Sequence, residues 1–149
     1  MTNIQLENKA IDTLIADFFS VFDNRSGQVP DLNKLRKLMI PEALIIKNCD
    51  SNTEVFNIDA FIKPREILLT SGELVEFFEE EVSAKTDIFG DIAQRFCVYK
   101  KSGETKGETF EIYGKKTIQL IKVGEKWMIT SVAWTDETEN LKIETSFRK

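Results

Sequence analysis

The sequence of 149 residues contains no histidine. Histidine is the usual general base for serine and cysteine nucleophiles and a common metal ligand. Its absence excludes Ser-His-Asp and Cys-His catalysis and any histidine metal site. Proton transfer by an aspartate or glutamate base, with a tyrosine as hydrogen-bond donor, is still compatible with the composition.

Cysteines are few, and long apolar runs are missing. The two cysteines, Cys49 and Cys97, match no zinc or redox spacing, so we expect reduced thiols in a cytoplasmic protein. No stretch approaches the roughly 20 apolar residues of a membrane span. The first residues also lack the basic region of a signal peptide. The sequence therefore predicts a cytoplasmic protein with no membrane partner.

Signals for cofactors and nucleic acid are missing as well. There is no glycine-rich phosphate loop and no nucleotide-binding fingerprint, so no cofactor is expected. Lys plus Arg total 20 against 25 Asp plus Glu, which gives a net charge of −5. This acidic balance argues against nucleic acid as a partner.

The composition that is present is that of a globular protein, with 42% apolar and 30% charged residues. A chain of this length can bury a core without disulfides. No linker or repeat divides it, so we expect one domain over 1–149, with a polar tail over 138–149 that is partly flexible.

Helical periodicity dominates the first part of the chain. Apolar residues recur at positions i, i+3, i+4 and i+7 within 7–24, which predicts an amphipathic helix. A short second helix is expected from the N-cap Asp31 to Pro41, and a third over 60–69.

Strand patterns dominate the rest. Two short β-type runs, 43–47 and 54–58, predict a small hairpin. Longer strands are expected over 91–101, 109–122 and 126–135, whereas 73–86 fits a helix or a strand. Helices followed by a meander of strands predict an α+β fold, a curved antiparallel sheet with the helices packed on one face.

The order of these elements resembles that of the nuclear transport factor 2-like (SnoaL-like) superfamily. The clearest likeness is the closing hairpin, which reads YGKKTIQLI over 113–121, GEKWMI over 124–129 and AWTDE over 133–137. The segment FFEEEV over 77–82 is similar to a Phe-His-Glu-Trp-Glu-Val strand of that group, without its His and Trp. This favours a strand over 76–86.

The resemblance implies a cone-shaped, cystatin-like roll with the helices on the concave face and a pocket between sheet and helices. Members include isomerases, dehydratases and polyketide cyclases, and also binding or scaffold domains without chemistry. The fold alone therefore does not assign an activity.

The candidate catalytic residues are Glu80, Tyr99 and Arg95. On a strand, Glu80 shares a face with Phe78 and Val82, and a carboxylate among apolar neighbours would have a raised pKa, as a general base or acid requires. A two-residue turn at 89–90 would place Glu80 near Tyr99. The competing interpretation is a solvated face, since residues 73–81 include five glutamates.

Candidate ligand-binding residues lie on the same strands. Asp91 begins the strand of Arg95 and Tyr99, while Tyr113 and Gln119 share one face of the next long strand and could instead satisfy each other. Trp134 is expected on the face opposite Trp127, seven positions away, and packing is its simpler role. The acidic group Asp136, Glu137 and Glu139 lies near a flexible tail and is poorly preorganised, so no metal site is predicted. The candidate ligand-binding residues are therefore Phe78, Asp91, Tyr113, Gln119 and Trp134.

We expect a small-molecule-binding domain with a hydrophobic pocket and a small hydrophobic ligand. One alternative is an isomerase, cyclase or dehydratase that acts on a carbonyl substrate by proton transfer, and another is a non-catalytic interaction module. The long strands carry apolar residues on both sides and the helices can cover only one. A homodimer packed through sheet faces is therefore expected.

Overall fold

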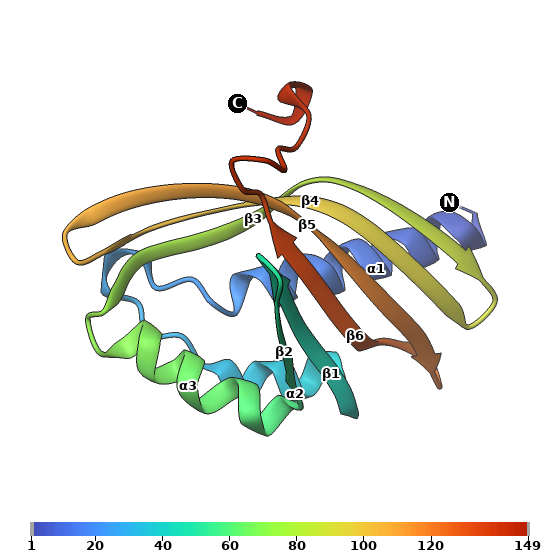
Figure 1. Cartoon of the computed structure of the whole chain (residues 1–149). Coiled ribbons are helices and arrows are strands. Elements are labelled where there is room, and N and C mark those ends of the chain that lie inside the picture. The colour runs from blue at the N-terminus through green and yellow to red at the C-terminus, as the bar shows by residue number, and fades with distance from the viewer. Residues whose placement is uncertain (1, 149) are drawn as a thin grey trace.

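The computed structural model describes residues 2–148 and is built around one curved sheet of six strands (Figure 1). The spatial order is β2-β1-β6-β5-β4-β3. Every neighbouring pair is antiparallel except β1 and β6, which run parallel. The strands are β1 (Met39–Cys49), β2 (Asn52–Phe56), β3 (Leu74–Phe89), β4 (Ile92–Thr105), β5 (Glu108–Val123) and β6 (Lys126–Asp136).

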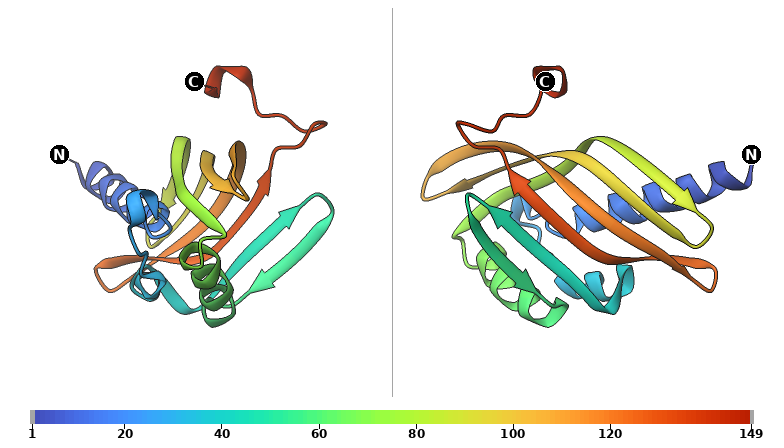
Figure 2. Two further views of the ribbon diagram at one scale, coloured as in Figure 1. Left: turned by 90° about the vertical axis from the view of Figure 1, so that its left-hand side faces the viewer. Right: turned by 45° about the vertical axis from the view of Figure 1, so that its right-hand side comes forward.

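The helices gather on the concave side of the sheet, while the C-terminal segment lies on the other side (Figures 1 and 2). A capping box of Thr2 and Gln5 starts the long first helix. None of the helices within 2–148 combines the length and the apolar character needed to cross a membrane. The helices are α1 (Asn3–Ser20), α2 (Leu35–Leu38) and α3 (Ile58–Thr70), with short 3-10 turns η1 (Arg25–Gly27), η2 (Leu32–Lys34) and η3 (Thr145–Phe147).

The predicted α+β architecture is confirmed, and the ambiguous segment over 73–86 is a strand. The expectation of a wholly antiparallel sheet is wrong at one pair. After the short second helix, the chain enters β1 alongside β6 in the same direction, and β2 then forms the outer edge of the hairpin. Pro41, expected to end the second helix, lies within β1.

Bulges in β3 and β6 help to decide which side chains face the helices. In β3 the pairing shifts between Glu81 and Ser83, so that Val82 is the extra residue. In β6 a shift at Thr130 changes the alternation between the two tryptophans. Trp127 and Trp134 therefore both lie in the main core, and the expectation that they face opposite sides is wrong.

The outer face of the sheet carries a second, smaller apolar cluster. Val98 of β4 and Tyr113 of β5 pack there against Ile143 from the C-terminal segment, with Val82 and Phe147 at its border. Ile143 is buried, so part of the tail is fixed to the sheet by apolar contact. The flexibility expected for 138–149 stays a prediction, and residue 149 lies outside the described residues.

A buried asparagine joins three elements where α1 ends. The Asn24 side-chain amide donates hydrogen bonds to the carbonyls of Leu69 and Leu74, at 2.9 and 2.8 Å. Its side-chain oxygen accepts from the Phe77 backbone N–H at 2.7 Å. The end of α3 and the start of β3 are thereby fixed to the segment that follows α1.

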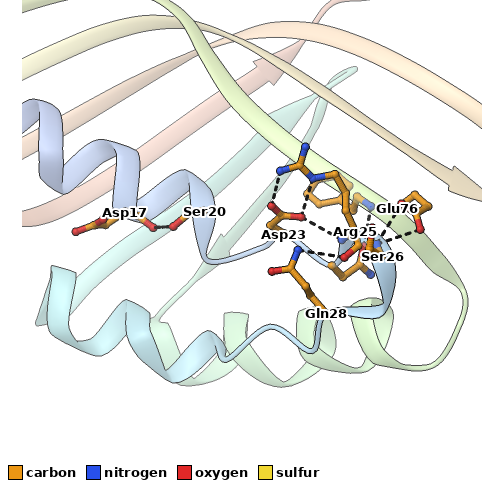
Figure 3. Close-up of polar contacts among 9 residues, drawn as sticks. Asp17, Ser20, Asp23, Arg25, Ser26, Gln28 and Glu76 are labelled. Carbon is orange, nitrogen blue, oxygen red and sulfur yellow. Dashed lines mark hydrogen bonds and ion pairs between the residues drawn. The ribbon is translucent and has the colours of Figure 1, made fainter.

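The residues on either side of Asn24 extend this junction at the surface (Figure 3). Asp23 and Arg25 form an ion pair at 2.7 Å, and the Arg25 guanidinium lies 3.7 Å from the centre of the Phe78 ring. The backbone N–H of Ser26 donates to the Glu76 carboxylate at 3.2 Å. These contacts hold the first residues of β3 against η1.

Asn24→Ala is expected to lower the free energy of unfolding by about 2–3 kcal/mol, because it leaves buried backbone groups without partners. Urea unfolding followed by circular dichroism measures the change. The control is Asn33→Ala, an exposed asparagine whose loss should cost less than about 0.5 kcal/mol. Equal unfolding midpoints for the two variants would show that the hydrogen bonds of Asn24 do not stabilise the fold, contrary to this prediction.

Candidate functional site

A cavity lies between the concave face of the sheet and the helices α1 and α3. Its free volume is about 50 Å³, which has room for a few water molecules. Other hollows of the surface are larger, at about 360, 570, 280 and 230 Å³, and are lined by other sets of residues. The residues that line the cavity are Phe18, Phe22, Ile45, Phe61, Arg65, Phe77, Glu79, Lys101, Lys116 and Trp134.

Aromatic rings in edge-to-face contact form one side of the cavity. The Phe22 and Phe61 ring centres are 6.0 Å apart, and those of Phe61 and Trp134 are 6.4 Å apart. Phe18 extends the row on α1, 5.8 Å from Phe22. Such contacts stabilise the core beyond simple burial and hold the rings in fixed orientations.

A buried ion pair crosses the cavity wall. The Lys116 ammonium lies 3.0 Å from a Glu79 carboxylate oxygen, and the two side chains are only 5% and 8% exposed. The same ammonium lies 4.3 Å from the Tyr99 ring centre and 4.5 Å from that of Trp134. One carboxylate and two aromatic faces therefore compensate the buried charge of Lys116.

A second polar group lies behind this pair and runs across three strands. Tyr99 of β4, Gly114 of β5 and Asp136 of β6 are directly opposite one another. Because Gly114 has no side chain, the Tyr99 hydroxyl reaches across β5 and donates a hydrogen bond to Asp136. Lys101 adds an ion pair to Asp136 at 2.9 Å.

The protonation states of this group follow from its contacts. Burial raises the pKa of Tyr99, and the hydrogen bond to Asp136 raises it further, so the phenol stays neutral. Burial by itself would raise the pKa of Asp136. The Lys101 charge and the Tyr99 hydrogen bond outweigh that effect and hold the pKa below its ordinary value. Asp136 is therefore a carboxylate at neutral pH.

Arg65 of α3 differs from the other charged residues of the cavity. Its guanidinium lies 4.9 Å from the Phe61 ring centre. Among residues 2–148 it forms no hydrogen bond or ion pair with another side chain. Burial lowers the pKa of Arg65, although an arginine remains charged at neutral pH.

Glu80 lies on the face of β3 opposite to Glu79, because successive strand residues alternate. It is directly opposite Lys100, not Tyr99, and is partly exposed. The hairpin turn falls at 90–91, one position later than expected, and the bulge at Val82 puts Ala84 on the other face. Glu80 borders the open hollow beside α1 together with Phe78, and it is not among the residues that line the cavity.

Arg95 and Tyr99 share the concave face, but Arg95 is part of a separate ion-pair network. Its guanidinium donates to Glu81, to Asp12 at 2.7 Å and to the Thr86 hydroxyl at 2.9 Å. These bonds join α1 to the sheet. A catalytic role for Glu80, Tyr99 and Arg95 stays a prediction, and the geometry separates Glu80 from the other two.

The predicted ligand-binding residues are dispersed. Trp134 lines the cavity. Phe78 lies beneath Arg25 and borders the open hollow beside α1. Asp91 is exposed in a turn, Gln119 is exposed, and Tyr113 is buried in the outer-face cluster. Only Trp134 of these five lies at the cavity, while the role of each as a ligand contact stays a prediction.

The acidic residues weighed as a metal cluster are held by different partners. Asp136 binds Tyr99 and Lys101, whereas Glu137 pairs with Arg148 of the tail. Within residues 2–148, no three Cys, Asp or Glu side chains are arranged to hold a metal ion.

The sequence interpretation missed the four charged residues of the cavity wall, Arg65, Glu79, Lys101 and Lys116. A signal existed for Lys116, because it shares the alternation of Ile118 and Leu120, which face the core. Glu79 was hidden in a run of glutamates that is typical of a solvated face. Nothing in the local sequence distinguishes Arg65 from a surface residue of α3.

No protein-family model matches the chain, and no curated protein sequence matches it either. Solved structures do match. A nuclear transport factor 2-like superfamily protein from Salmonella enterica has a TM-score of 0.71 at 13% identity, covering 89% of this chain and 92% of its own. An NTF2-like protein with a cystatin-like fold from Novosphingobium aromaticivorans has a TM-score of 0.70 at 12% identity, covering 98% and 91%.

A third solved structure is that of a proposed scytalone dehydratase from Novosphingobium aromaticivorans. Its TM-score is 0.72 at 14% identity, and the match covers 94% of this chain and 91% of its own. Likeness at this level of identity concerns the fold. The fold expected from the resemblance, a cystatin-like NTF2 roll, is confirmed.

Proposed function

We propose that this chain, which has the NTF2-like fold, binds a small organic molecule in the cavity between its sheet and helices. The observation that carries the proposal is the lining of the cavity. Aromatic rings and charged groups of α3 and the sheet line it together, with Arg65 against the Phe61 ring and Lys116 against the Trp134 ring. A wall of mostly apolar side chains with a few placed polar groups is the usual composition of a small-molecule site.

Catalysis by proton transfer is the alternative, and one structural neighbour is named as a proposed dehydratase. An enzyme of that kind needs a carboxylate that exchanges its proton near neutral pH. Here Glu79 is paired with Lys116, while Lys101 and Tyr99 stabilise the charged form of Asp136. Both carboxylates are thus held by cations, which favours binding over acid–base chemistry.

The two tryptophans of β6 provide the test of binding. The indole N–H signal of Trp134 should shift in NMR spectra when a fragment enters the cavity. Trp127 is also buried, but it bonds to Glu7 at the far end of β6 and should not respond. A diverse fragment library that never shifts the Trp134 signal selectively would refute the proposal.

We further propose that the protein forms a homodimer through the outer face of its sheet. Phe89, Ile92 and Phe96 are 84%, 58% and 54% exposed, beyond the part that the C-terminal segment covers. The helices occupy the concave side only, and an exposed apolar row of this kind is typical of a protein contact.

Static light scattering should give about twice the chain mass of 17.1 kDa at micromolar concentration. Phe96→Glu should give the mass of one chain, because it places a charge in the apolar contact. Thr109→Glu, at an exposed position away from that row, is the control and should keep the wild-type mass. A monomeric wild-type chain would contradict the dimer.

A further inference from the structure

The charges that line the cavity do not balance. Lys116 is neutralised by Glu79 at 3.0 Å, and Lys101 by Asp136 at 2.9 Å. Arg65 is left over, since it forms no ion pair with any residue in the described part of the chain. The cavity and its immediate wall therefore carry one uncompensated positive charge.

The surroundings of Arg65 make that charge available to a ligand. The acidic groups with the largest electrostatic influence on it are Glu79, Glu54 and Asp136, and none is within ion-pair distance. Glu79 and Asp136 already form ion pairs with Lys116 and Lys101. The guanidinium is partly buried beside the Phe61 ring, so it is less well hydrated than a surface arginine.

We propose that the ligand of this cavity is a small monocarboxylate, with its anionic group on Arg65 and its apolar part against Phe22, Phe61 and Trp134. This inference rests on the proposed function and specifies its ligand class. A guanidinium presents parallel N–H donors that match the two oxygens of a carboxylate.

Charge and size select a carboxylate over other anions. A phosphate ester carries up to two negative charges, and only one positive charge of the lining lacks a partner. The free volume of about 50 Å³ admits only a few heavy atoms. The three rings leave an apolar surface that an inorganic anion would not cover. A short aliphatic acid satisfies all three conditions.

The test uses three probes with one four-carbon chain: butanoate, butanamide and 1-butylamine. Each is titrated into the wild-type protein while the Trp134 indole signal is followed. Butanoate should bind at least about tenfold more tightly than the amide, since a hydrogen bond to a charged group contributes about 1.5–3 kcal/mol. The amine should bind most weakly.

Three variants of α3 complete the test. Arg65→Gln should remove the preference for butanoate over butanamide. Arg65→Lys should keep part of that preference, because an ammonium retains the positive charge but lacks the parallel N–H donors of a guanidinium. Lys63→Gln is the control, since it removes one positive charge from an exposed position of the same helix. Melting curves establish that all three variants are folded.

The outcomes separate the two proposals. Equal binding of acid and amide, or a preference that survives in Arg65→Gln, overturns the carboxylate assignment and leaves the cavity as a binding site. If no probe of any charge and no library fragment shifts the Trp134 signal, the proposed function itself fails, and the ligand class fails with it.

Discussion

Lys116→Met is expected to lower the free energy of unfolding by about 3–5 kcal/mol, because it leaves the buried Glu79 carboxylate without its counter-charge. Both side chains of this pair are less than a tenth exposed. Methionine is similar to lysine in length and leaves little empty space, so the loss reports the charge and not a cavity. Guanidinium or urea unfolding of the two proteins measures the difference.

Two further variants make this result specific to the buried pair. Lys85→Met removes a lysine of β3 whose partner Asp87 is 3.9 Å away, with side chains 82% and 53% exposed, so it should cost less than about 1 kcal/mol. The double change Lys116→Met with Glu79→Gln should recover part of the loss, since no charge is then left buried. A Lys116→Met protein as stable as Lys85→Met would contradict the predicted cost.

Element type was predictable because it follows local periodicity. The apolar spacing of α1 and the alternation of β5 each extend over several repeats, so one irregular position does not hide them. Even the ambiguous β3 was assigned correctly, with help from its likeness to a known strand pattern. The order of helices and strands then restricts the possible folds to few.

The face on which each side chain lies was less predictable, because one extra residue in a strand reverses it. The bulge at Val82 separates Glu80 from Ala84, and the bulge at Thr130 brings Trp127 and Trp134 to one side. Neither bulge is marked by a glycine or proline. The predicted site centred on Glu80 depended on this alternation, whereas the structure places Glu79 at the cavity.

The partners of charged residues were the least predictable feature, because they lie far apart in the sequence. Lys116 and Glu79 meet across the concave face, and Tyr99 reaches Asp136 from two strands away. Alternation along a strand indicates that Tyr99 and Lys116 face inward, but only after the bounds of β4 and β5 are known. The identity of a partner requires the register of four strands, which no local pattern contains.

Because Gly114 lies between Tyr99 and Asp136, a single methyl group added at this position should strongly lower the free energy of unfolding. In Gly114→Ala the added Cβ would lie against the Tyr99 hydroxyl and ring, and 2.5 Å from the Thr135 carbonyl oxygen. That oxygen is backbone and cannot move away easily, and displacing the ring breaks the hydrogen bond to Asp136. Overpacking costs about 1–3 kcal/mol and the lost charged bond about 1.5–3, so we expect a loss of about 3–5 kcal/mol.

Gly103→Ala on β4 is the matched control, and it tests whether the effect of Gly114→Ala is specific. Its added Cβ would meet side-chain atoms of Phe110 and Leu74 at 3.1 and 3.2 Å, contacts that small side-chain movements can relieve. Its cost should stay within about 1 kcal/mol. Tyr99→Leu in the Gly114→Ala background should recover part of the loss, because the colliding ring is then absent. Comparable unfolding midpoints for Gly103→Ala and Gly114→Ala would show that the chain accepts a side chain beneath Tyr99, contrary to this geometry.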